Sequence, residues 1–216
     1  APDMDAFGRP LNCTSRHMMH RYPYRSQCNL HLTQKFHSLY PLARNVPILS
    51  KKSAVGIVMA TGSVGAAIDK DNVDVYLSTD GGMYWAQVLR GPHFYAFGDH
   101  GGIIVAIRQG NITNEIIYSH DEGETWEKYV FSQERIIVYG LLTEPGEKTT
   151  VFSLFGSRPD RHSWIVVQVN LSSVLGSPCG ADDYKQWSPT DNPRVDCLLG
   201  SKMVFERRIA HSLCFN

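Results

Sequence analysis

Two copies of one eight-residue pattern, Ser-x-Asp-x-Gly-x-x-Trp, constrain the fold of this chain more than any other feature. The copies occupy residues 78–85 and 119–126, and their aspartates lie 41 positions apart. Four-stranded propeller blades repeat at about 40–50 residues. Ser and Asp side chains can bond backbone amides across a tight hairpin, Gly supplies a positive φ, and Trp packs under the turn. The repeat therefore predicts successive β-propeller blades, each carrying an Asp box.

The two boxes are interpreted as structural turns. Their expected members are Ser78, Asp80, Gly82 and Trp85 in the first box, and Ser119, Asp121, Gly123 and Trp126 in the second. Because Asp and Ser dominate turns for purely local reasons, the two aspartates are not predicted to form a catalytic carboxylate pair. The segment from Ser157 to Asp160, followed by Trp164, resembles a worn third copy with the wrong spacing.

Short β-type runs fill residues 54–169, and no segment keeps a helical period over a helical length. Expected strands cover residues 54–60, 73–77, 84–89, 94–97, 102–107, 115–118, 125–131, 135–142, 149–155 and 163–169. A spacing of about 8–12 residues is typical of sandwiches, barrels and propellers, and the repeat favours the propeller. Residues 1–50 are predicted to be a loop-rich leading segment. The fold class is thus all-β.

Charge and hydropathy exclude some partners. Lys plus Arg and Asp plus Glu both number 21, so no broad field favours nucleic acid or an anionic membrane. The local cluster Glu206-Arg207-Arg208 is interpreted as a solvated surface. No apolar run approaches the ~20 residues of a transmembrane helix, and the N-terminus lacks a signal peptide's features. A secreted chain would have lost its signal or begun mid-protein.

Cysteines and sequons indicate the compartment. Cys13, Cys28, Cys179, Cys197 and Cys214 cluster at the two ends without any C-x-x-C pair, which argues against a structural zinc site. N-glycosylation sequons begin at Asn12, Asn111 and Asn170. Together these features favour an oxidising, lumenal or extracellular compartment. Spacing alone leaves the pairing open, including Cys179–Cys197 with Cys214 free.

The sequence around the boxes resembles the sortilin-type sorting receptors. The matching segments are residues 73–82, 91–95, 99–107, 121–123 with Trp126, and 140–146, in that order. Residues 30–50, 139–148, 154–157 and 197–200 are closest to the SorLA branch of that family. The resemblance runs from about residue 28 to residue 216, and it is weak before Cys28 apart from the spaced cysteines.

The resemblance implies the last blades of a ten-bladed propeller followed by a small disulfide-rich module, the ten-CC module. Residues 1–175 would belong to the blades and residues 176–216 to the start of the module. It also implies Cys13–Cys28 and Cys179–Cys214 bridges, and a partner for Cys197 beyond the last residue, hence a truncated chain. No catalytic residue, metal or cofactor is implied, and the cargo-contact residues are unassigned.

The implied function is capture of lumenal or extracellular cargo by the ectodomain of a single-pass membrane receptor. Such a receptor carries propeptides, growth factors and, in the SorLA branch, amyloid precursor protein between Golgi, endosomes and cell surface, and a shed form is conceivable. The remaining blades would be further partners. A sialidase-like glycosidase, which needs an arginine cluster, a Tyr–Glu nucleophile pair and an acid/base Asp, lacks its signature here. A structural adhesion propeller is the other alternative. The chain is not expected to be an enzyme.

Three histidines near predicted turns, His93, His100 and His120, suggest one hypothesis about acidity. Endosomal acidification crosses the ordinary His pKa of ~6.5, so protonation could loosen blade packing or cargo. Ordinary turn or surface histidines are the simpler interpretation, because nine histidines in one chain make such proximity common.

Overall fold

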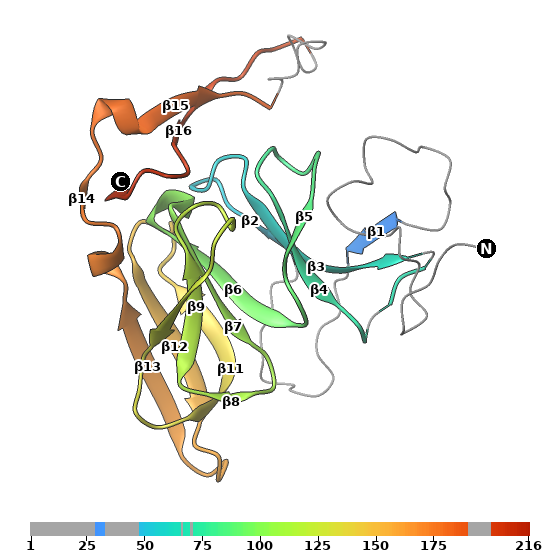
Figure 1. Cartoon of the computed structure of the whole chain (residues 1–216), viewed down its shortest axis with the longest axis vertical. Helices are drawn as coiled ribbons and strands as arrows, with labels where there is room; N and C mark the ends of the chain where they lie inside the picture. Colours follow the sequence, from blue (N-terminus) through green and yellow to red (C-terminus); the bar gives the residue numbers. More distant parts are fainter. Residues whose placement is uncertain (1–28, 33–47, 66, 70, 190–199) are drawn as a thin grey trace.

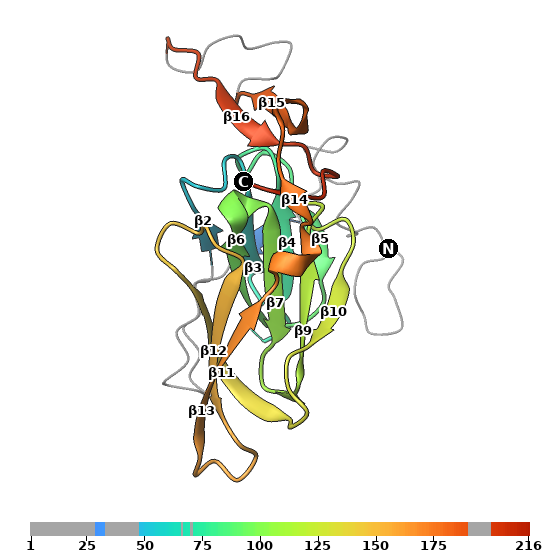
Figure 2. The ribbon, with the colours of Figure 1, turned by 90° about the vertical axis from the view of Figure 1, so that its left-hand side faces the viewer.

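Three antiparallel sheets lie side by side in the computed structural model, and a small module covers one end of them (Figures 1 and 2). The structure describes residues 29–32, 48–65, 67–69, 71–189 and 200–216. Within these residues the regular structure is strand apart from three short 3-10 turns, so the all-β expectation is confirmed. The Cys13–Cys28 bridge, the Asn12 sequon and Cys197 lie outside the described residues.

Each sheet is built on an antiparallel meander of consecutive strands, as in a propeller blade. The first contains β1 (Asn29–Leu32), β2 (Ile48–Ser50), β3 (Val58–Gly65), β4 (Asp74–Ser78) and β5 (Ala86–Leu89), with β1 and β2 both paired to β3. The second contains β6 (His93–Gly98), β7 (Ile103–Arg108), β9 (Glu115–Ser119) and β10 (Glu127–Val130). The third contains β8 (Ile112–Thr113), β11 (Ile136–Thr143), β12 (Val151–Ser157) and β13 (Trp164–Asn170). The first sheet thus has an additional strand on β3, and the third includes β8 from the β7–β9 connection.

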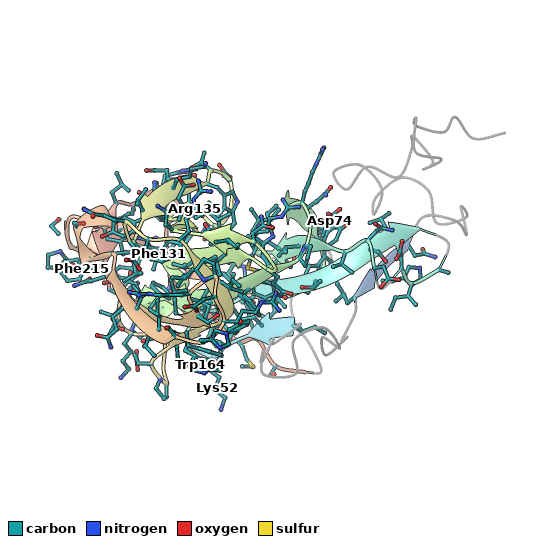
Figure 3. All side chains as sticks on the ribbon, turned by 90° about the horizontal axis from the view of Figure 1, so that it is seen from below. Lys52, Asp74, Phe131, Arg135, Trp164 and Phe215 are labelled. Carbon is teal, nitrogen blue, oxygen red and sulfur yellow. A yellow bond between two sulfur atoms is a disulfide. The ribbon has the colours of Figure 1, made fainter. Side chains whose placement is uncertain are left out.

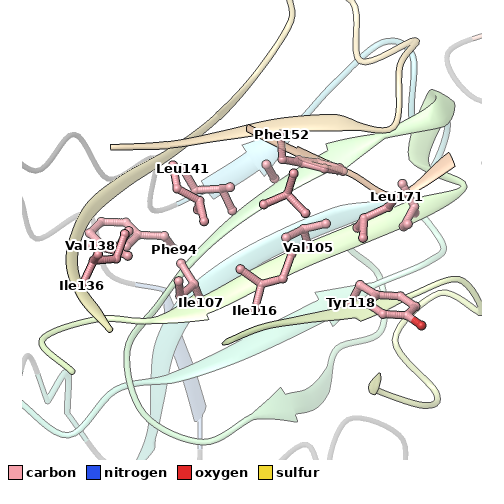
Figure 4. Packing of buried hydrophobic residues seen from close by; sticks show 14 of the residues in the cluster. Phe94, Val105, Ile107, Ile116, Tyr118, Ile136, Val138, Leu141, Phe152 and Leu171 are labelled. Carbon is pink, nitrogen blue, oxygen red and sulfur yellow. The ribbon is translucent and has the colours of Figure 1, made fainter. Parts of the chain in front are cut away.

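The second sheet is buried on both faces, which is what distinguishes stacked blades from a two-layer sandwich. In β7, Ile103, Val105 and Ile107 pack toward the third sheet, while Ile104 and Ala106 pack toward the first. Successive side chains of a strand point to opposite faces, so this near-continuous apolar run serves two cores at once. Figure 4 shows the core between the second and third sheets.

The core between the second and third sheets is the larger of the two. Phe152 and Leu154 of β12 and Ile116 of β9 are almost completely buried in it. Full burial of such a side chain contributes about 1.5–3 kcal/mol. Because each blade face is covered only by its neighbour, the folding of one sheet depends on the next.

One predicted strand is misplaced. Residues 54–56 form a turn, and β3 begins at Val58 and continues to Gly65. The amide of Ile57 donates to the carbonyl of Ala54, and Gly56 has φ +73°, which closes the turn before the strand can start.

The worn third box is not an Asp box. Residues 158–163 connect β12 and β13 at the opposite end of the sheets from the two true boxes (Figure 1). The following Trp164 is 63% exposed instead of packing under the turn.

The C-terminal module consists of two small pairs of strands. Parallel β14 (Ser177–Pro178) and β17 (Cys214–Phe215) form one pair, and antiparallel β15 (Tyr184–Trp187) and β16 (Phe205–Arg208) form the other. A disulfide joins Cys179 to Cys214, with an S–S distance of 2.02 Å. This is the pairing that the family resemblance implies, and it excludes the Cys179–Cys197 alternative. A boundary near residue 175 stays a prediction.

Candidate functional site: the Asp-box end of the blades

The first box forms the hairpin between β4 and β5. Ser78 Oγ donates to Asp80 Oδ1 over 2.8 Å and accepts the amide of Gly82 over 2.8 Å. Asp80 Oδ1 also accepts the amides of Met83 and Tyr84. The carboxylate thus caps backbone donors that the turn would otherwise leave unpaired.

The second box forms the hairpin between β9 and β10 with the same geometry. Ser119 Oγ donates to Asp121 Oδ1 and accepts the amide of Gly123, each over 2.8 Å. Thr125 donates to the carboxylate twice, through its amide and its hydroxyl. Burial alone would raise the pKa of Asp121, but the hydrogen bonds from Thr125 and Ser119 hold that pKa below its ordinary value.

Each turn places two consecutive residues at positive φ. Gly81 and Gly82 adopt φ of +79° and +97°, and Gly123 adopts +83°. In the second box the first of these positions is Glu122, at +59°. A non-glycine residue in this region is uncommon and costs free energy, so a side-chain role is expected for Glu122.

The two tryptophans close their hairpins differently. Trp85 Nε1 donates to the carbonyl of Gly82 over 2.9 Å. The Trp126 ring packs against the core between the first and second sheets. Both box aspartates are engaged in turn hydrogen bonds.

Arg207 of the C-terminal module joins the two boxes. Its guanidinium donates to the carbonyl of Thr79 in the first box over 2.6 Å and lies 2.6 Å from the Glu122 carboxylate in the second. The side chains of Arg207 and Glu122 are only 6% and 15% exposed. The Arg207 guanidinium also lies over the ring of Trp187, 5.9 Å from its centroid. One side chain thus ties the module to two blades. The ion pair with Arg207 is the side-chain role expected for Glu122 at its positive φ.

Arg208 reaches the opposite side of β16 and binds backbone carbonyls only. It donates to Gly102 and His120 of the second blade and to Ser212 and Cys214 of its own module. Burial lowers the pKa of Arg208, and the nearby carboxylate of Asp99 works in the other direction.

Asp99 completes the junction. The backbone amide of Asn216 donates to Asp99 Oδ1 over 2.8 Å, and the side-chain amide donates to the carbonyl and to Oδ2. Burial raises the pKa of Asp99, against the hydrogen bonds from Asn216 and the charge of Arg208. We call the contacts of Arg207, Arg208 and Asn216 with the blades the module junction.

The solvated-surface interpretation of Glu206-Arg207-Arg208 was wrong for both arginines, which are 7% and 8% exposed. Their partners in the blades lie about 85 to 130 positions away in the sequence, so no local pattern identifies them. The one sequence signal was Glu122, an acidic residue where the first box has glycine.

The three histidines differ in environment. His93 is buried, its Nδ1 lies 3.0 Å from the carbonyl of Gly91, and burial lowers its pKa. His100 is exposed in η1 (Asp99–Gly101) at φ +56°. His120 lies beside Glu127, with 3.5 Å between Nε2 and Oε1, next to the module junction.

The two described sequons present exposed asparagines. Asn111 precedes β8, and Asn170 ends β13. Both asparagines are therefore open to solvent.

Among the described residues, two groups combine metal-ligating side chains. Cys179, Asp183 and Cys214 form one, but both its cysteines are in the disulfide and offer no thiolate. Asp121, Glu124 and His211 form the other. No helix within the described ranges is long and apolar enough to span a bilayer.

Comparisons with known proteins agree with this architecture. A family model described as "Sortilin, neurotensin receptor 3" matches residues 9–141, and one described as "Sortilin, neurotensin receptor 3, C-terminal" matches residues 143–216. The two matches meet inside β11, so a single sheet contains both.

Three relatives illustrate the degree of similarity. Sortilin-related receptor from Mus musculus is 50% identical over 218 residues, covering 100% of this chain and 9% of the relative. Sortilin from Mus musculus is 41% identical over 89% of this chain and 24% of the relative. VPS10 domain-containing receptor SorCS1 from Homo sapiens is 31% identical over 99% of this chain and 17% of the relative. The chain thus spans less than a quarter of the length of each.

Proposed function

Because this chain belongs to the sortilin family of receptors, we propose that it is part of the lumenal, ligand-binding ectodomain of a sorting receptor. In this role it would help carry protein and peptide cargo between Golgi, endosomes and cell surface. The observation that carries the proposal is the succession of two sortilin family matches along a chain whose three blades and module form one connected structure.

The outer face of the third blade supports a place inside a larger ring. Leu142, Trp164 and Val166 are 53%, 63% and 73% exposed, while alternate residues of the same strands are buried against the second blade. Trp164, labelled in Figure 3, packs beside Tyr139 with ring centroids 5.6 Å apart. Exposed apolar surface of this kind marks an interaction face, and we assign it to the remaining blades of the same receptor.

The proposed cargo is protein or peptide: propeptides, growth factors and proteins of the amyloid-precursor type. Blade edges and loop-lined pockets can take extended peptide segments through main-chain hydrogen bonds. The chain itself shows which end is less available, because the module junction covers the Asp-box ends of the first two blades. Cargo contact is therefore proposed for the surfaces away from that junction.

Uptake by cells tests the receptor role. Cells with and without the receptor that contains this chain would be given fluorescently labelled growth-factor propeptide. We expect saturable uptake into endosomes that depends on the receptor. Equal uptake in both cell lines, with the receptor present at the cell surface, would contradict the proposal and favour a structural adhesion role.

We propose no catalytic function. The relatives are named as receptors, and both box aspartates serve turn amides. Incubating the folded chain with a fluorogenic sialoside tests the glycosidase alternative. We expect no hydrolysis above a sialidase-free blank, and turnover abolished by Asp121→Asn would overturn this expectation.

The proposed setting is the secretory and endosomal lumen and the cell surface, with glycans on Asn12, Asn111 and Asn170 and bridges Cys13–Cys28 and Cys179–Cys214. Cys197 is proposed to pair outside residues 1–216. Peptide mapping of the secreted ectodomain, before and after removal of N-glycans, tests all of these assignments. Recovery of unmodified Asn111 and Asn170 peptides, or of Cys179 linked to Cys197, would contradict them.

A further inference from the structure

Three side chains that can coordinate a divalent metal meet where the second Asp box faces the C-terminal module. Asp121 and Glu124 belong to the box, and His211 follows β16 in the module. One ligand atom from each lies within 4.8 Å of the other two. We propose that these residues bind a divalent zinc ion, which cross-links the β9–β10 hairpin to the module.

The Asp121 carboxylate is already fixed in position. It is 4% exposed, and Ser119 and Thr125 donate hydrogen bonds to it. Such outer partners orient a metal ligand and keep it ionised.

The module junction positions the other side of the site. The neighbouring pair Arg207–Glu122, at 2.6 Å, and the bond from Arg208 to the Ser212 carbonyl hold the segment that carries His211 against the box. His211 Nε2 lies 3.7 Å from Glu124 Oε2. Ligand atoms around tetrahedral zinc, at about 2.0–2.2 Å from the metal, are roughly 3.3–3.6 Å apart, so only small side-chain rotations are needed.

The donor set selects the class of metal. One imidazole nitrogen with two carboxylates suits zinc, whereas calcium and magnesium prefer oxygen ligands alone. The charges of Asp121 and Glu124 balance those of Zn²⁺ when the imidazole is neutral. Three protein ligands leave the fourth tetrahedral position to water.

The first box shows that the cluster is not a general property of Asp boxes. Its residue equivalent to Glu124 is Met83. The turn hydrogen bonds of the two boxes nevertheless match. The turn therefore does not require Glu124, and the carboxylate is free for another role.

Calorimetric titration of the full chain with ZnCl₂ tests the proposal. Wild type is compared with His211→Ala and Glu124→Gln. Both side chains are more than 60% exposed, at 68% and 66%, so these variants are expected to fold. We expect each to weaken the site by more than about tenfold, since loss of outer partners alone costs about 10- to 100-fold.

His162→Ala serves as the matched control, because His162 is exposed on the β12–β13 hairpin. It should leave the affinity of the strongest zinc site unchanged. Equal affinities in wild type and His211→Ala would overturn the proposal. So would a stronger response of wild type to CaCl₂ than to ZnCl₂, because the imidazole would then play no part.

Discussion

Two neighbouring arginines on β16 contact different kinds of groups, which their positions in the sequence do not reveal. Arg207 binds an acidic side chain and a carbonyl on two blades, and Arg208 binds only carbonyls. The Asp boxes could be named from the sequence because the Ser, Asp and Gly of each box make their turn hydrogen bonds within four positions. The arginines could not, because their partners in the blades come from distant parts of the chain.

Removing Arg207 tests the module junction at the scale of one residue. Arg207→Ala leaves Glu122 partly buried without its partner, so we expect a loss of about 3 kcal/mol in the free energy of unfolding. The exposed pair Arg158–Glu134 is the matched control, and Arg158→Ala should cost less than about 1 kcal/mol. Guanidinium-induced unfolding of the chain measures both. Equal losses would show that the junction does not stabilise the fold.

His93 predicts a dependence of stability on pH. Burial lowers its pKa in the folded chain, with Arg108 acting in the same direction and Gly91 and Asp74 opposing. The unfolded chain then binds more protons, so stability is lost as pH falls below the ordinary His pKa of ~6.5.

His93→Gln should weaken the dependence of the free energy of unfolding on pH between pH 7 and pH 5. His162→Gln, at an exposed histidine, is the comparison and should leave that dependence unchanged. Chemical unfolding at several pH values measures the slope. An unchanged slope in His93→Gln would remove His93 from any response to endosomal acidity.

At the scale of strands, short β-type runs separated by turn residues predicted most of the three sheets. Nine of the ten expected strands overlap an observed one closely. At residues 54–56 a turn replaces the expected strand, and a β-carbon on Gly56 would lie 2.7 Å from the ring of Trp187. The glycine therefore serves the module as well as the turn, and no local pattern could show this.

Gly156 in β12 gives a prediction at this scale. A β-carbon there would lie 2.1 Å from the carbonyl oxygen of Ile137 on β11, beside the bulge in that pairing. Gly156→Ala should therefore cost about 1–3 kcal/mol, as overpacking does. At Gly65, by contrast, the nearest atom would be 3.7 Å away. Thermal unfolding should show a clear loss for Gly156→Ala and almost none for Gly65→Ala.

At the scale of the whole molecule, the exposed apolar face of the third blade is the feature that bears on assembly. Val166→Lys should impair assembly of a larger ectodomain, because burying an unpaired charge is costly. Val130→Lys, on the exposed edge strand β10, is the matched change. We expect lower secretion of the ectodomain for Val166→Lys only. Equal secretion of both variants would mean that no blade covers this face.

Surface plasmon resonance tests most directly the proposal that this chain helps a receptor to hold peptide cargo. The secreted ectodomain, with the Cys179–Cys214 bridge verified, would be immobilised and exposed to a synthetic growth-factor propeptide. We predict saturable binding that unlabelled propeptide competes away. A folded, bridged ectodomain that gives no saturable response to such propeptides would contradict the claim.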